Sequence, residues 1–165
     1  VILYTLFGPL IARFEAERGL TRGGPGSELS AMVYGEYFPN PAMFGTDAAA
    51  YALVSPAAAF AAEALGTALL VLFIFALTDA YNDNRPGRGG VALAIGAGVT
   101  ILICILAPLT QACFNPARDF GPRLVAWFAG WGEVAIPGPR GGFLTVYVLA
   151  PLVGAVIGGC AYDYL

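Results

Sequence analysis

Residues 89–117 contain no Asp, Glu, Lys or Arg, and this uncharged run limits the folds open to the chain more than any other feature. A hydrocarbon core about 30 Å thick is crossed by about 20 apolar helical residues. The composition agrees, because 58% of the residues are hydrophobic, 12% are charged and the mean hydropathy is +0.73. The sequence therefore predicts an all-α membrane protein.

Three segments have the length and composition of membrane-spanning helices. They are residues 58–79, 90–107 and 142–163, and residues 1–11 have the character of the end of a further span. The connection over residues 12–57 is long enough to be a shaped loop at a membrane surface. Because the chain begins inside an apolar run, we expect residues 1–165 to form one partial domain of a longer protein.

Small residues recur at four-residue intervals in each predicted span, which puts them on one face of a helix. Such rows let neighbouring backbones approach closely, as helix packing in membranes requires. The rows are Ala58, Ala62 and Gly66; Gly90, Ala94 and Gly98; and Gly154 and Gly158. The pattern predicts a packed helical bundle.

Several classes of function are disfavoured by composition. The net charge is −3 and all eight basic residues are Arg, so no basic face is available for nucleic acid. Cys104, Cys113 and Cys160 form no CxxC pair and the chain has no His, so we interpret them as buried packing residues and expect no metal or cofactor. An enzyme is disfavoured because His and a GxSxG motif are both missing from the sequence.

Residues 90–127 cannot form a single membrane-spanning helix, because it would be about 57 Å long at 1.5 Å per residue. Pro108 is expected to end the first helix. Asn115 is a strong N-cap, Pro116 is favoured at the first helical position, and Asp119 falls in the first turn, where an acid is stabilised. The sequence therefore predicts a re-entrant loop and a half-helix over residues 108–129.

Irregular backbone at membrane depth is tolerated only where it is buried in protein or lines a water-filled cavity. Arg118 favours the cavity, since an arginine inside a membrane normally faces water or a partner. The alternative is that Asn115 is a simple helix cap and Arg118 a side chain that reaches the membrane surface. The residues alone leave both interpretations open.

The segment "NPARDFGPRLVAWFAGWG" resembles the second signature loop of the major intrinsic proteins, the aquaporins and glycerol facilitators. The likeness covers nearly the whole chain, including "APLT" before the loop and "YVLAPLVGAVIGG" in the last span. Four positions that separate glycerol channels from water channels are of the glycerol type here: Asp119, Arg123, Pro151 and Leu152. The resemblance implies an aquaporin-like bundle in which this chain is the second inverted repeat of a six-span fold.

The resemblance also implies roles for individual residues. Asn115 and Arg118 would contact solute in the pore, with the carbonyls of Gln111, Ala112 and Cys113 as acceptors along one wall. Apolar side chains would form the opposite wall.

Further residues would shape the pore loop or its filter. Pro116, Ala117 and Asp119 would shape the loop, and Glu63 would hold it by accepting hydrogen bonds from its amides. Two filter positions depart from the glycerol-channel pattern: Ile103 replaces a glycine, and Ala112 replaces an aromatic residue. Cys113 is a candidate for sensitivity to mercurials.

By the same resemblance, the intact protein would be a passive channel for glycerol and other small neutral solutes, together with water, that excludes ions and protons. A water-selective channel is the alternative, and a membrane structural protein without flux is a remote one. We expect a homotetramer in the lipid bilayer of the cell membrane, plasma or inner, with the Asn115 loop on its outer side. A second Asn-Pro-Ala, residues 40–42, is interpreted as part of the outer loop rather than as a pore motif.

Overall fold

The computed structural model describes residues 1–164, apart from the side chain of Arg88, and those residues contain helices and no strands. Three helices are long and apolar enough to cross a membrane: α5 (Pro56–Thr78), α6 (Arg88–Thr110, apolar from Gly89), and the continuous pair η3 (Phe143–Leu149) and α8 (Ala150–Asp163). The 23 residues of α5 correspond to about 35 Å at 1.5 Å per residue, enough to cross a bilayer core.

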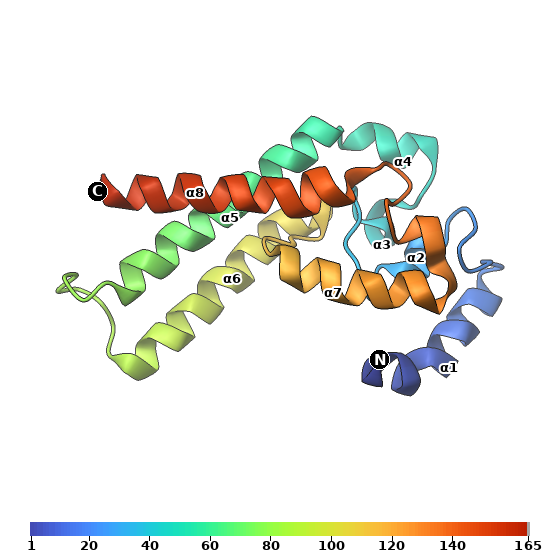
Figure 1. Ribbon diagram of the computed structural model, residues 1–165, viewed down its shortest axis with the longest axis horizontal. Coiled ribbons are helices and arrows are strands. Elements are labelled where there is room, and N and C mark those ends of the chain that lie inside the picture. Colours follow the sequence, from blue (N-terminus) through green and yellow to red (C-terminus); the bar gives the residue numbers. More distant parts are fainter. Residues whose placement is uncertain (165) are drawn as a thin grey trace.

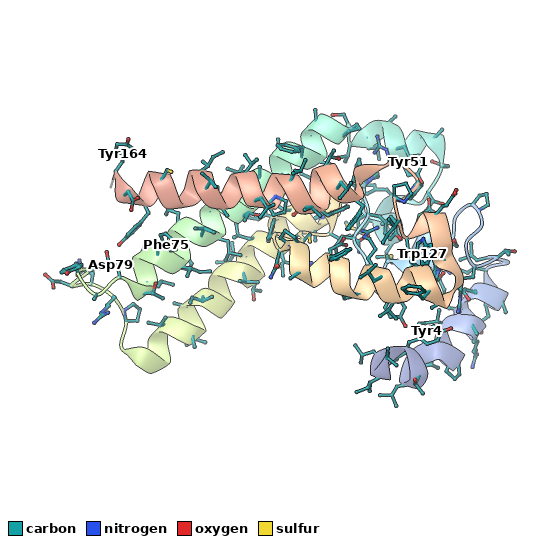
Figure 2. The ribbon with its side chains drawn as sticks, viewed as in Figure 1. Tyr4, Tyr51, Phe75, Asp79, Trp127 and Tyr164 are labelled. Atoms are coloured by element: carbon teal, nitrogen blue, oxygen red, sulfur yellow. The ribbon has the colours of Figure 1, made fainter. Side chains whose placement is uncertain are left out.

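The remaining elements lie toward one end of these long helices, as Figure 1 shows. They are α1 (Ile2–Glu17), the short helices α2 (Glu28–Ala31), α3 (Pro41–Phe44) and α4 (Ala48–Leu53), and the chain that follows the half-helix, η1 (Trp127–Trp131) and η2 (Gly132–Val134). The turn between α5 and α6 lies at the opposite end with the C-terminus. Side chains mark both ends in Figure 2, with Asp79 and Tyr164 at one and Tyr51 and Trp127 at the other.

Helix α7 (Pro116–Ala126) is the half-helix. It begins beside the middle of the long helices and runs back toward the end that carries the short helices (Figure 1). Asn115 is its N-cap, and the Asn115 side chain accepts a hydrogen bond from the Ala117 amide at 2.9 Å. The helix is about 16 Å long, too short to cross the bilayer core.

Helix α5 packs mainly against α8, and two glycines set their separation. A Cβ on Gly154 would lie 2.2 Å from the carbonyl oxygen of Ala64, and one on Gly158 would lie 2.2 Å from that of Ala68. The small row on α8 therefore faces α5, as helix packing in membranes favours. On α5 the facing residues are Ala64 and Ala68, whereas Gly66 of the row picked out in the sequence faces a different partner.

Helix α6 ends later than the sequence suggests, because it continues through Pro108 to Thr110. Pro108 has no amide to donate to the carbonyl four residues earlier, and its ring crowds that carbonyl, yet prolines are tolerated inside membrane helices. Asn40 contacts the last turn of the helix, where carbonyls lack a full set of helical donors: its backbone amide donates to Pro108 O at 3.1 Å and its side chain donates to Ala107 O at 3.2 Å. The second Asn-Pro-Ala therefore starts the four-residue helix α3 and contacts the end of α6.

The interpretation of the cysteines as buried is right for one residue and wrong for two. Cys113 is 2% exposed, whereas Cys104 on α6 and Cys160 on α8 are exposed. An apolar residue in a membrane helix need not be covered by its own chain, because lipid or another helix can cover it. Apolar sequence alone does not distinguish these surroundings.

Candidate functional site

The segment between α6 and α7, residues 111–115, is here called the carbonyl loop. Gln111, Ala112 and Phe114 adopt left-handed backbone conformations with φ of 63°, 57° and 55°. Residues with a Cβ rarely adopt this region, which costs roughly 1–2 kcal/mol per residue. Three such residues within four positions persist only when surrounding contacts over-determine them, as happens at functional sites.

Glu63, fully buried on α5, makes two of those contacts. Its carboxylate accepts hydrogen bonds from the amides of Cys113 at 2.9 Å and Phe114 at 2.7 Å. Thr67, one turn further along α5, donates its hydroxyl to Phe114 O at 3.3 Å. The carboxylate thus satisfies two amides of the carbonyl loop that would otherwise be buried without partners. Accepting hydrogen bonds from loop amides is the role that the resemblance implies for Glu63.

Gly66 lies between these two residues and makes room for the loop. A Cβ at Gly66 would lie 2.1 Å from the Phe114 ring, far closer than atoms can pack. The ring therefore lies directly against the backbone of α5. Hydrogen bonds and close packing together hold the carbonyl loop to one helix.

Arg118 reaches back from the first turn of α7 to the same loop. Its Nη1 donates to Ala112 O at 3.3 Å and, at a distance of 3.5 Å, to Cys113 O. The Arg118 side chain is 46% exposed and Asn115 is also exposed. Exposed amide and guanidinium groups thus lie beside a strained run of backbone carbonyls at the start of a half-helix, where the helix dipole is positive.

The remaining residues of the predicted wall are arranged less simply. The Gln111 side chain accepts a hydrogen bond from the Tyr37 amide at 2.7 Å, so it ties the carbonyl loop to the long connection before α5. The Ala112 side chain is 1% exposed, and Ile103 on α6 is half-buried. Cys113 is 2% exposed and packs against residues that include Ala59 and Val146. Its sensitivity to mercurials stays a prediction.

Of the four residues expected to mark the glycerol type, three are buried and one is exposed. Asp119 and Arg123 form an ion pair on α7, with Nε to Oδ2 at 2.6 Å, and both side chains are at most 1% exposed. Pro151 is buried in α8, where it follows Ala150, and Leu152 is 52% exposed.

Arg123 has further partners that explain its burial. Its Nη1 donates to Ala135 O at 2.7 Å, and its Nη2 donates to Asp119 Oδ1 at 2.8 Å and to Glu36 O. The guanidinium also lies within 5.4 Å of the ring centres of three aromatic residues, Tyr37, Phe143 and Tyr147. A buried charge is tolerated when paired and hydrogen-bonded in this way.

Glu36 is the site residue that the sequence analysis missed. Its Oε1 lies 2.7 Å from Arg118 Nη1, and its side chain is 12% exposed. Burial raises the pKa of Glu36 to about 7, although the nearby Arg118 acts in the opposite direction. A signal was present in the sequence, because an acid directly precedes the aromatic pair and "PNP", but a loop position gives no indication of which distant residue it meets.

Comparison with known proteins places this chain in a family. The model of the family described as "Major intrinsic protein" matches residues 26–162. The glycerol uptake facilitator protein of Pseudomonas aeruginosa is 37% identical over 99% of this chain and 54% of its own length. A propanediol uptake facilitator of Citrobacter freundii is 36% identical over 100% of this chain and 57% of its own. The chain therefore spans about half the length of the curated relatives it matches.

Among solved structures, the aquaglyceroporin from Plasmodium falciparum has a similar fold, with a TM-score of 0.69 and 23% identity over 99% of this chain and 57% of that one. The predicted aquaporin-like helical fold is thereby confirmed, as is the likeness to the glycerol-facilitator branch. Members of the family are integral membrane proteins, in keeping with three apolar helices of membrane-spanning length. The re-entrant half-helix, its carbonyl loop and the matched family model lead to one conclusion: this chain belongs to the major intrinsic protein family.

Proposed function

We propose that the full-length protein is a passive channel for glycerol and other small neutral solutes, and that this chain supplies one wall of its pore. The observation that carries the proposal is the contact between Arg118 and the carbonyls of Ala112 and Cys113 at the start of a half-helix. The names of the relatives, glycerol and propanediol uptake facilitators, support small polyols as the solutes.

The proposed wall has the chemistry that a polyol needs when it leaves bulk water. A hydroxyl group both donates and accepts hydrogen bonds, and it loses both kinds of partner on entering a narrow pore. The backbone carbonyls of the carbonyl loop accept, while Asn115 and Arg118 donate. Replacing the lost bonds by fixed groups lowers the cost of entry without requiring any chemical step.

The same groups oppose ions. The Arg118 charge and the positive end of the α7 dipole repel cations and protons, a device known from aquaporin-type pores. Water is expected to pass together with glycerol. Ile103 adds bulk where glycerol channels have a glycine, and Ala112 removes an aromatic ring, so both tune the balance between glycerol and water.

The proposed assembly and location are those that the family resemblance implies. We propose that the full-length protein forms a homotetramer in the plasma or inner cell membrane, with the carbonyl loop toward the outer side. The lipid-facing surface of such an assembly needs no charged residues. Exposed large apolar side chains on α6, among them Leu93, Ile101 and Ile105, fit a helix that meets lipid or a neighbouring helix.

The proposal is tested by light scattering from vesicles that contain the full-length protein. Under an osmotic gradient, the rates of water efflux and glycerol entry are compared with those of empty vesicles, and proton leak is followed with an internal pH dye. We expect glycerol entry well above the empty control with no added proton leak. Fast water with little glycerol would support the water-selective alternative, and flux equal to empty vesicles in folded protein would reject the channel.

A further inference from the structure

Glu36 lies between α2 and α3, in a segment that is held to α7 through its backbone. The Glu36 amide donates to Asp119 Oδ1 at 2.7 Å, and the Glu36 carbonyl accepts from Arg123 Nη2. Gly35 lets this contact form, because a Cβ there would lie 2.8 Å from the Arg123 guanidinium carbon. The buried ion pair of α7 therefore fixes the backbone from which the Glu36 side chain projects.

The Glu36 carboxylate meets the one arginine that the proposed pore uses. Arg118 Nη1 lies 2.7 Å from Glu36 Oε1, and the same nitrogen contacts Ala112 O at 3.3 Å. One guanidinium nitrogen is thus shared between a carboxylate and the carbonyl loop. Since Arg118 is about half-exposed, its position depends on these few contacts rather than on close packing.

The groups around Glu36 act on its pKa in opposite directions. The charged groups facing it are Arg118, Asp119 and Arg123 from α7 and Glu63 from α5. Burial is the largest influence on the pKa of Glu36 and raises it; Arg118 and Arg123 lower it, Asp119 and Glu63 raise it, and the net pKa is about 7. The carboxylate is therefore charged above about pH 7 and neutral below it, within the range that a cell membrane meets.

We propose that Glu36 is a specificity-determining residue of this channel, whose carboxylate holds the Arg118 guanidinium against the carbonyl loop and thereby keeps the pore open to glycerol. When Glu36 is charged, the pair keeps the arginine at the wall. When Glu36 is neutral, Arg118 gains freedom and its charge is unpaired. Glycerol, being larger than water, is slowed more by this change. The inference rests on the proposed channel function.

The test is the pH dependence of glycerol and water permeability in vesicles containing the full-length protein. We expect glycerol permeability of the unmodified protein to fall about threefold between about pH 8.5 and about pH 5.5, the change that loss of one partly exposed ion pair supports. The midpoint is expected near pH 7, and water permeability is expected to change less. In Glu36→Gln, glycerol permeability should be low and independent of pH.

Two further variants separate a pore role from a general effect on folding. Glu36→Asp keeps a titrating carboxylate on a shorter stem, so it should retain part of the pH dependence. Glu133→Gln removes an exposed glutamate of η2 and should behave as the unmodified protein. Size-exclusion chromatography in detergent shows that each variant is folded before its flux is compared.

The outcomes distinguish the inference from the function on which it rests. If the unmodified protein conducts glycerol and Glu36→Gln follows the same pH profile, the role of Glu36 is rejected and the channel stands. A flat pH profile in the unmodified protein rejects it equally. If the folded unmodified protein conducts no glycerol at any pH, both the channel and the role of Glu36 fail.

Discussion

Helix α7 carries two arginines that each meet a carboxylate at nearly the same distance but in opposite surroundings. Arg123 pairs with Asp119 at 2.6 Å, and both side chains are at most 1% exposed. Arg118 pairs with Glu36 at 2.7 Å, with exposed fractions of 46% and 12%. Distance alone would rank the two pairs as equals.

Burial is what separates them. Arg123 is surrounded by aromatic rings and bonded to the carbonyls of Ala135 and Glu36, so removing it leaves Asp119 as an uncompensated buried charge. Arg118 stays in contact with water, so its pair contributes little to stability, and its donors remain available to a solute. One arginine therefore stabilises the fold, and the other is free to serve the proposed pore.

The largest effect on stability is expected from Arg123→Met. Loss of the guanidinium strands the buried Asp119 carboxylate and should lower the free energy of unfolding by about 3–5 kcal/mol. Thermal unfolding of the full-length protein in detergent measures this, with Arg13→Met as the control, since Arg13 makes only an exposed pair with Glu17 on α1. Equal melting temperatures for the two variants would contradict the structural role of Arg123.

A smaller loss is expected from Glu63→Gln, which acts on the loop that receives Arg118. One carboxylate oxygen becomes an NH2 group, so one of the amides of Cys113 and Phe114 loses its acceptor, at a cost of about 1–3 kcal/mol. The Glu63→Gln variant should also show altered glycerol permeability per folded molecule in vesicle assays. A variant with unchanged stability and unchanged flux would show that the carbonyl loop does not need Glu63.

Gly66→Ala tests the same loop through packing instead of hydrogen bonding. The new methyl group must displace the Phe114 ring, and such overpacking costs about 1–2 kcal/mol. Gly96→Ala on α6 is the matched control, because nothing lies within 4 Å of a Cβ there. In chemical unfolding, Gly66→Ala should therefore be less stable than the unmodified protein, and Gly96→Ala should be about as stable. The reverse order would refute the packing described here.

The smallest effect on stability is expected from Arg118→Met, at about 0–1 kcal/mol, because the arginine is partly exposed and Glu36, whose pKa is about 7, can take up a proton when it loses its partner. Its effect on transport should nevertheless be large. Removing the positive charge that the proposed wall directs at the solute should allow protons or cations to leak. If Arg118→Met lowered the melting temperature as much as Arg123→Met, the claim that only Arg123 stabilises the fold would be contradicted.

The sequence predicted those parts of the site that depend on neighbouring residues. Asn115 and Pro116 start a half-helix because an N-cap and a proline at the first helical position are local signals. The lengths of the long helices follow from hydrophobicity in the same way. The end of α6 does not, because the helix continues past Pro108 to Thr110.

Contacts between distant segments were beyond the reach of the sequence. Glu36 and Arg118 meet only because the long connection before α5 folds onto α7, and no periodicity reports that contact. The exposure of Cys104 and Cys160 was missed for a similar reason, since lipid-facing and buried apolar residues have the same composition. The pairing of Asp119 with Arg123 has helical i,i+4 spacing, yet its burial depends on Glu36 and Ala135.

The most direct test of the central claim is the flux of glycerol and of protons through vesicles containing Arg118→Met, each divided by the amount of folded protein. If Arg118 and the carbonyl loop form the wall of a glycerol pore, the variant should fold normally and leak protons about tenfold faster than the unmodified protein, while glycerol still enters. Glycerol entry and proton exclusion both unchanged in the folded variant would contradict the claim.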